Sequence, residues 1–208
     1  MRIAVQAPSG LHFVTDVEAG LEETGRSLLA ELAERTGQRA PGPVPERLAH
    51  DWYIVELRRT ANEVLVCEPD YARGGRGYVA SVSATSAICG AQRRLHAALS
   101  APRAPVRYDQ GVVLEPGALE HDGVLATRAE AARSDDTGWR LIRDARGAPP
   151  SRWEALRVYE LAGRRPIVVA GLLLPVGWSF KVAGEAIEEV AAPVGAKTRV
   201  DVALRPQP

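Results

Sequence analysis

Hydrophobic residues alternate with polar ones in some stretches of the chain and recur every three to four residues in others, which predicts both strands and helices. The alternating stretches and short apolar runs predict strands over residues 3–5, 11–14, 52–57, 64–68, 78–83, 112–114, 123–128, 139–143, 178–182 and 187–190. Strands and helices are mixed without regular strand–helix–strand alternation. The pattern therefore indicates an α+β fold, with mixed, mostly antiparallel sheets packed against a few helices.

The clearest helical segment follows Thr15, which has Glu18 three residues later in the spacing of a capping box. Gly37 is expected to end this helix. Its apolar face would consist of Val17, Leu21, Leu28, Leu29 and Leu32. Two further helices are expected over residues 85–99 and 152–161.

Proline and glycine positions predict how the chain is organised. The proline-rich segment 40–45 is expected to be a stiff linker after a first strand–helix unit. The predicted regions are a βα subdomain (1–44), a hairpin-plus-helix region (45–105), a C-terminal region (106–192) and a loose tail (193–208). Residues 45–192 are expected to form one compact unit.

Charge and composition narrow the possible partners and location. Formal net charge is zero, but residues 1–70 hold 7 basic and 12 acidic side chains, whereas residues 71–110 hold 6 and 1. A neutral chain lacks the general positive field of a nucleic-acid binder. No signal peptide or membrane span is apparent, so a cytoplasmic protein is expected. Arginine supplies 24 of the 26 basic residues, which is typical of a GC-rich bacterial genome.

The common catalytic and metal-binding motifs are absent from the sequence. It contains no phosphate-binding loop, dinucleotide fingerprint, HExxH, CxxC or GxSxG, so no metal or cofactor is expected. The two cysteines, Cys67 and Cys89, are expected to be reduced core residues. A nucleophilic pair of either cysteine with His96 is the less favoured alternative.

Two short segments could carry chemistry. Glu68-Pro69-Asp70-Tyr71 places two carboxylates at the end of an apolar strand, which suits a turn, a partner-binding surface or a metal-dependent hydrolase. Asp135 to Arg140 suggests a turn in which Asp136 accepts backbone N–H groups and Trp139 anchors the core. For both segments the structural interpretation is favoured, with Asp70 also accepting local backbone N–H groups.

Exposed tyrosine and arginine side chains are the best candidates for contacts with a protein partner, because these residue types are enriched at binding hot spots. The candidates lie in the loop after residue 69 and on the helix that follows: Asp70, Tyr71, Arg73, Arg76, Arg93 and Arg94.

The second half of the chain resembles a bacterial polymorphic-toxin immunity protein family, number thirty-three, formerly a domain of unknown function. The resemblance lies in the turn Asp136-Thr137-Gly138-Trp139, in which Thr137 replaces the usual serine, and in Leu174-Pro175-Val176-Gly177-Trp178-Ser179. Longer members also carry an upstream Trp-containing strand and a Glu-Pro-Asp turn. The matching residues here are Trp52, Glu68, Pro69, Gln92, Asp136, Gly138, Trp139, Tyr159, Pro175 and Gly177.

The resemblance implies a non-enzymatic protein that binds and neutralises a cognate toxin delivered by contact-dependent or type VI-like secretion. The uneven charge along the chain is compatible with steering toward a charged partner. Two alternatives stay open: a general protein-binding adaptor, and a metal-dependent hydrolase that uses Glu68, Asp70 and Asp136.

Overall fold

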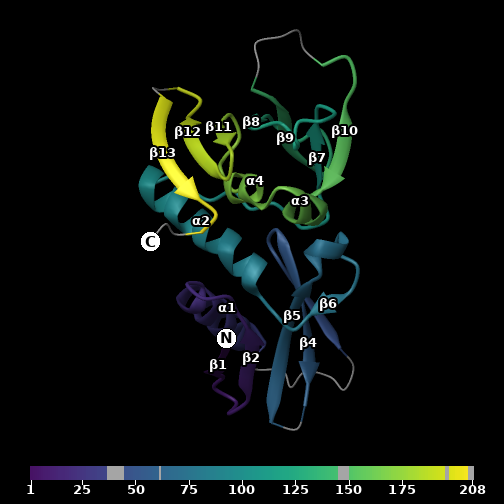
Figure 1. Ribbon diagram of the computed structural model, residues 1–208, viewed down its shortest axis with the longest axis vertical. Coiled ribbons are helices and arrows are strands. Elements are labelled where there is room, and N and C mark those ends of the chain that lie inside the picture. The colour runs from purple at the N-terminus through teal and green to yellow at the C-terminus, as the bar shows by residue number, and fades with distance from the viewer. Residues whose placement is uncertain (37–44, 61, 145–149, 195–196, 206–208) are drawn as a thin grey trace.

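The chain forms two β-sheets at opposite ends of an elongated molecule, with helix α2 (Ser83–Leu99) between them (Figure 1). The computed structural model describes residues 1–36, 45–60, 62–144, 150–194 and 197–205. This mixture of helices with mostly antiparallel sheets confirms the predicted α+β class.

The first sheet has the strand order β1-β2-β5-β4-β3, and β6 also pairs with β5. Its strands are β1 (Arg2–Gln6), β2 (His12–Asp16), β3 (Glu46–His50), β4 (Tyr53–Arg59), β5 (Glu63–Pro69) and β6 (Tyr78–Val79). Strands β2 and β5 are parallel and the other pairs are antiparallel. Helix α1 (Glu22–Thr36) packs on β1 and β2 and carries acidic residues in its first turn, where they interact favourably with the helix dipole.

The second sheet has the strand order β10-β7-β9-β8-β11-β12-β13. Its strands are β7 (Gly111–Leu114), β8 (Gly123–Arg128), β9 (Asp136–Arg143), β10 (Glu154–Arg157), β11 (Ser179–Ala183), β12 (Ala186–Ala191) and β13 (Lys197–Ala203). Only β7 and β9 pair in parallel among these described strands. Two short helices, α3 (Val158–Arg164) and α4 (Pro166–Gly171), lie between this sheet and the first half of the molecule (Figure 1).

A single continuous cluster of buried apolar side chains connects the two sheets. Helix α2 contacts α1 on one side and α4 and β13 on the other. Its inward residues Ile88 and Leu95 are fully buried, as the spacing of apolar positions predicts. The core therefore passes through α2 rather than dividing into two separate clusters.

Both predicted hairpins are confirmed. The segments expected at 52–57 and 64–68 form the antiparallel pair β4–β5, and those at 178–182 and 187–190 form β11–β12. The segment expected at 78–83 is a strand only over β6, because α2 already begins at Ser83.

The predicted start of the first helix is wrong. Thr15 lies inside β2, and its buried hydroxyl donates to the carbonyl of Val66 on β5 at 2.8 Å instead of capping a helix. Strand pairing therefore overrides the local capping-box spacing. Helix α1 begins at Glu22, whose carboxylate accepts the amide N–H of Gly20 at 2.9 Å.

Two predictions in the C-terminal part are also wrong. Residues 154–157 of the expected helix 152–161 form β10, since they pair with β7, and the helix starts only at Val158. The expected loose tail contains β13, which pairs with β12. Both segments lie at the edges of the second sheet; β10 pairs with β7, which is distant in sequence, whereas β13 pairs with the strand directly before it.

The predicted linker 40–45 lies almost entirely outside the described residues, as does Gly37. The proposed regions 1–44, 45–105 and 106–192 stay predictions. In the structure, β2 of the first region lies beside β5 of the second.

Candidate functional site: a polar pocket where the two halves meet

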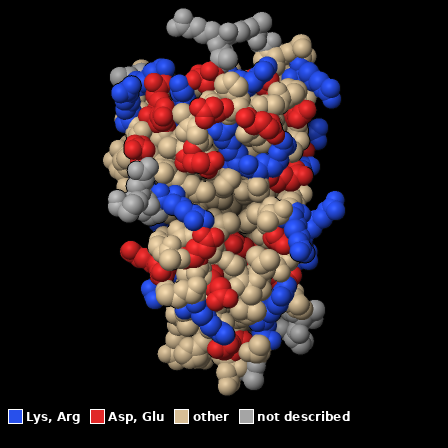
Figure 2. Space-filling model, in the orientation of Figure 1, with Lys and Arg blue, Asp and Glu red and all other residues tan. Residues whose placement is uncertain are grey.

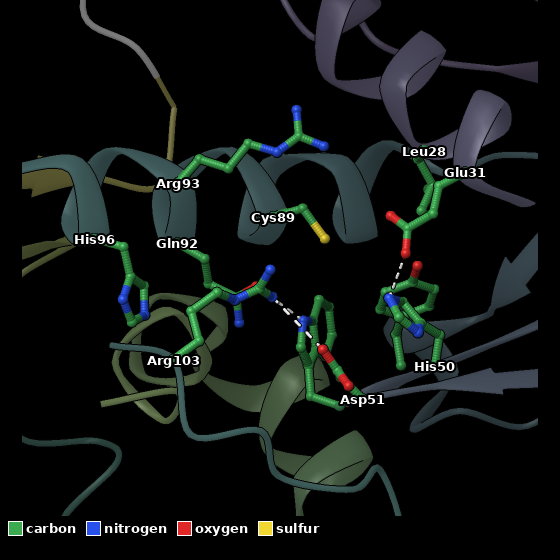
Figure 3. A pocket seen from close by; sticks show the side chains of 11 residues that line it. Leu28, Glu31, His50, Asp51, Cys89, Gln92, Arg93, His96 and Arg103 are labelled. Carbon is green, nitrogen blue, oxygen red and sulfur yellow. Dashed lines mark hydrogen bonds and ion pairs between the residues drawn. The ribbon is translucent and has the colours of Figure 1, made fainter. Parts of the chain in front are cut away.

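A pocket with a volume of about 280 Å³ lies where α1, the turn between β3 and β4, α2 and the segment after α2 come together (Figure 3). Its lining comes from segments far apart in the sequence. Leu28 and Cys89 are joined there by charged, aromatic and amide side chains: Glu31, His50, Asp51, Trp52, Tyr53, Gln92, Arg93, His96 and Arg103.

A chain of two hydrogen bonds fixes one wall of the pocket. The indole N–H of Trp52 donates to Oε1 of Gln92 at 3.1 Å, and Nε2 of Gln92 donates to the carbonyl of Val169 on α4 at 3.2 Å. Trp52 and Gln92 are 1% and 3% exposed. Two residues named by the family resemblance, 40 positions apart, therefore connect the first sheet to the second half of the molecule.

The carboxylates that line the pocket are already engaged. Oε1 of Glu31 lies 2.5 Å from Nε2 of His50, while Nδ1 of that ring contacts the guanidinium of Arg35. Because arginine can only donate, Nδ1 accepts and Nε2 carries the proton toward Glu31. Asp51 pairs with Arg103 at 3.5 Å. Neither nitrogen of His50 is thus free to act as a general base.

Two buried polar atoms of the pocket lining have no hydrogen-bond partner among the described residues: the hydroxyl of Tyr53 and Nε2 of His96. Tyr53 is only 3% exposed, and burial raises its pKa, so the hydroxyl keeps its proton. Nδ1 of His96 lies 3.1 Å from the carbonyl of Ala101, to which it donates. Burial lowers the pKa of His96, so its ring is neutral at pH 7 and Nε2 is a free acceptor. Unsatisfied buried groups are uncommon in folded proteins.

The structure places Cys89 and His96, the alternative nucleophile and base, on the same pocket. Burial raises the pKa of the Cys89 thiol to about 12, so almost none of it is thiolate at neutral pH. Catalysis by cysteine depends on the thiolate. The pocket is therefore equipped for binding through polar groups and not for nucleophilic attack by this cysteine. Cys67 is buried elsewhere, as expected of a core residue, whereas Cys89, also expected in the core, is only partly buried and lines the pocket; both are free cysteines.

The carboxylates of the alternative hydrolase site have structural partners. Glu68 is buried, and its two oxygens accept the amides of Ala84 and Thr85 at 3.1 and 2.7 Å, which caps the start of α2. Burial raises the pKa of Glu68, and these hydrogen bonds oppose the rise. The described residues contain no group of three or more acidic, histidine or cysteine side chains able to hold a metal ion.

The predicted backbone contacts of Asp70 and Asp136 are confirmed, although the turn at residues 136–138 forms the first residues of β9, which was expected to begin at Trp139. Oδ1 of Asp70 accepts the amide of Arg73 at 3.3 Å at the start of a short 3-10 helix, η1 (Tyr71–Arg73). Oδ1 of Asp136 accepts the amide of Gly138 at 2.8 Å. Both carboxylates serve their own turns, as the sequence pattern suggested.

The residues predicted to contact a partner do not form one surface. Arg73 and Arg76 are exposed, but the Tyr71 side chain, expected on the surface, is partly buried and packs against the core. Arg94 donates to the carbonyls of Ala203 and Leu204 at 2.7 and 3.3 Å, which ties β13 to α2. Only Arg93, which is exposed, lines the pocket.

Sequence reasoning missed most of the charged residues of the pocket: Glu31, His50, Asp51 and Arg103. Each belongs to a different element or turn, and no short spacing joins them. The one signal in the sequence that points to the pocket is the family resemblance, which names both Trp52 and Gln92. These two residues form the wall beside which the charged residues lie.

The backbone geometry of the turn that carries the family resemblance explains which residue types fit at positions 137 and 138. Gly138 has a φ of 76°, and a Cβ there would lie 2.1 Å from the carbonyl oxygen of Ala129, so only glycine fits. The hydroxyl of Thr137 donates to the carbonyl of Gly111 at 2.7 Å and accepts the amide of Trp139 at 3.2 Å. Serine carries the same hydroxyl, so either residue suits this position.

Trp139 is the core anchor that the sequence predicted. It is fully buried, its indole N–H donates to the carbonyl of Leu172 at 2.9 Å, and it packs edge-on against Phe180. Trp153 differs, because it is 43% exposed beside a second hollow next to this turn.

The fold and the pocket define an α+β protein whose described site is suited to binding. Residues 91–193 match the family model of the Imm33-like domain, which supports the resemblance of this part of the chain to the immunity-protein family numbered thirty-three. The match includes Gln92 and the turn at Asp136 to Trp139 but not Trp52 or Glu68-Pro69-Asp70. No curated protein and no solved structure matches the chain.

Proposed function

We propose that this protein binds a cognate bacterial toxin in the cytoplasm and neutralises it without catalysing a reaction. The observation that carries the proposal is the match of residues 91–193 to the Imm33-like domain. We further propose that the toxin reaches the cell by contact-dependent or type VI-like secretion, the setting that this family implies.

Features of the described residues support a binding role. The carboxylates that could have served a hydrolase cap a helix or close turns, and the Cys89 thiol is protonated. None of the described helices is long and apolar enough to cross a membrane. Figure 2 shows acidic and basic side chains intermixed on the visible face, so recognition would rest on a local arrangement of charges.

The test is co-expression with the protein encoded by the neighbouring gene. We expect the two proteins to co-purify and the cells to survive expression of that product only when this chain is present. Binding without rescue would favour an adaptor, and neither binding nor rescue would contradict the proposal.

The predicted contact loop can be tested in the same assay. The double variant Arg73→Gln/Arg76→Gln removes two exposed charges, and Arg199→Gln on β13 is the matched control, because Arg199 is also exposed but lies on the other sheet. Weaker toxin binding by the loop variant alone would support the loop as part of the interface. Equal binding by both variants would place the interface elsewhere.

A further inference from the structure

We propose that β13 is the contact surface for a second copy of this chain. In this arrangement the β13 strands of the two copies pair antiparallel across a two-fold axis at Val200, which joins the two seven-stranded sheets into one continuous sheet. The inference goes beyond the proposed toxin binding and does not depend on it.

The edge formed by β13 is long and open. This strand ends the order of the second sheet, and Figure 1 shows it as the outermost strand there. Its seven residues make it the longest of the four strands that end the two sheet orders, since β1 and β3 have five residues each and β10 has four. An open edge presents backbone N–H and C=O groups with which another strand can pair.

Most of this edge is free of other backbone contacts. Arg94 of α2 donates to the carbonyls of Ala203 and Leu204, which occupies the C-terminal end of the edge. Residues 197–202 form no backbone hydrogen bonds with described residues other than those of the pairing with β12. These residues are therefore available to a further strand.

Two opposite charges on the exposed face of β13 lack a partner. Val200 is partly buried and packs against the core, so its neighbours Arg199 and Asp201 point to the opposite face, where both are exposed. Neither forms an ion pair in the part of the chain that the structure describes. Glu189, which lies opposite Arg199 on β12, pairs instead with Lys197 at 2.6 Å.

A second copy supplies the complementary charges by symmetry. In an antiparallel pairing centred on Val200, Arg199 lies opposite Asp201 of the second copy, and Asp201 lies opposite its Arg199. Opposite charges directly across two strands stabilise their pairing, whereas like charges destabilise it. Moving the axis by one residue in either direction would bring Arg199 or Asp201 opposite its own copy. Charge complementarity therefore favours both this partner and this register.

The other edge strands lack such a free pair. Arg2 on β1 is paired with a glutamate of β5 at 2.7 Å, and Arg47 on β3 with a glutamate of β4 at 3.5 Å. On β10 the amide of Arg157 already donates to the carboxylate of Glu160 at 2.7 Å. A two-fold pairing through β13 uses the same edge of both copies, so the assembly closes as a dimer.

The first experiment is sedimentation velocity of the full chain over a series of concentrations. We expect a reversible equilibrium between monomer and dimer. Arg199→Asp and Asp201→Arg each bring like charges opposite one another, so each should weaken the dimer about tenfold or more. Arg76→Asp reverses an exposed charge outside β13 and is the matched control, which should dimerise as the original protein does. Thermal melts of all variants check that the fold is kept.

Mixing the two single variants separates charge pairing from damage to the strand. In a mixed dimer, the two aspartates of Arg199→Asp lie opposite the two arginines of Asp201→Arg. The mixture should therefore associate more tightly than either variant alone. The double swap Arg199→Asp/Asp201→Arg again places opposite charges across the axis and should also restore the dimer.

Hydrogen exchange locates the contact. At concentrations where the dimer forms, the amides of β13 should exchange more slowly than in dilute protein, while those of the edge strand β10 should not change. The proposal is overturned by a monomer at every concentration, by assemblies larger than a dimer, by single variants that dimerise normally, or by a mixture that gains nothing. Arg199→Gln should weaken the dimer but leave toxin binding unchanged, so this proposal and the proposed function can fail separately.

Discussion

Gln92 offers the sharpest test of how the two halves of the molecule are joined. In Gln92→Met the side-chain volume is roughly kept, but the indole N–H of Trp52 loses its acceptor at a position that is 1% exposed. A buried donor without a partner costs about 1–3 kcal/mol. The carbonyl of Val169 still accepts the amide of Leu172 at 3.2 Å, so the loss of its bond from Gln92 adds little. We expect a loss of about 1–3 kcal/mol in the free energy of unfolding.

The assay is urea denaturation followed by far-UV circular dichroism, with a thermal melt as a second measurement. For a chain of this length the expected loss corresponds to a fall in Tm of about 2–12 °C. Trp52→Phe removes the N–H donor of this hydrogen bond instead of its acceptor. In a protein that already carries Trp52→Phe, the loss in free energy of unfolding caused by Gln92→Met should therefore be less than about half as large. The reasoning would be refuted if Gln92→Met cost under about 0.5 kcal/mol, or cost the same in both backgrounds.

Three further predictions concern other parts of the structure. Gly138→Ala should destabilise by several kcal/mol, at least about 3 kcal/mol in a thermal melt, because it adds a backbone clash to left-handed strain; Gly117→Ala, with a φ of 78° and open space around it, is the control and should lose only about 1 kcal/mol. Glu68→Ala should cost about 1–3 kcal/mol in urea denaturation because two amides at the start of α2 lose their acceptors, and Glu68→Gln should cost less; an equal loss in both would contradict the capping role. Alkylation of Cys89 by iodoacetamide should be slow at pH 7 and accelerate about tenfold per pH unit toward a pKa of about 12, since only the thiolate reacts; a rate that levels off below pH 9 would contradict a raised pKa.

Features that depend on neighbouring residues could be predicted from the sequence. The turn at Asp136 to Trp139 and the hairpin β4–β5 follow from local turn chemistry and alternation. The errors at Thr15 and at residues 154–157 arose where distant strands decide the outcome. Thr15 has the spacing of a cap, yet it belongs to β2 because β5 lies beside it, about fifty residues later.

The pocket could not be predicted for a related reason. Glu31, Asp51, Cys89 and Arg103 become neighbours only when α1, the β3–β4 turn and α2 pack together. Charged residues are common on protein surfaces, and nothing in the spacing of Glu31, Asp51 and Arg103 separates them from other charged positions. The turn that carries the family resemblance could be identified from the sequence, because backbone geometry within a few positions determines its residue types.

The position of α2 has a consequence for modularity. The segment shared with the Imm33-like family begins at residue 91, in the middle of this helix, and ends at residue 193, before β13. A fragment cut at these limits would lose the first turns of α2, the Glu68 carboxylate that caps them and the edge strand held by Arg94. The segment that matches the Imm33-like domain and the continuous buried core of this chain therefore have different boundaries, and the N-terminal half completes the fold as well as adding surface to it.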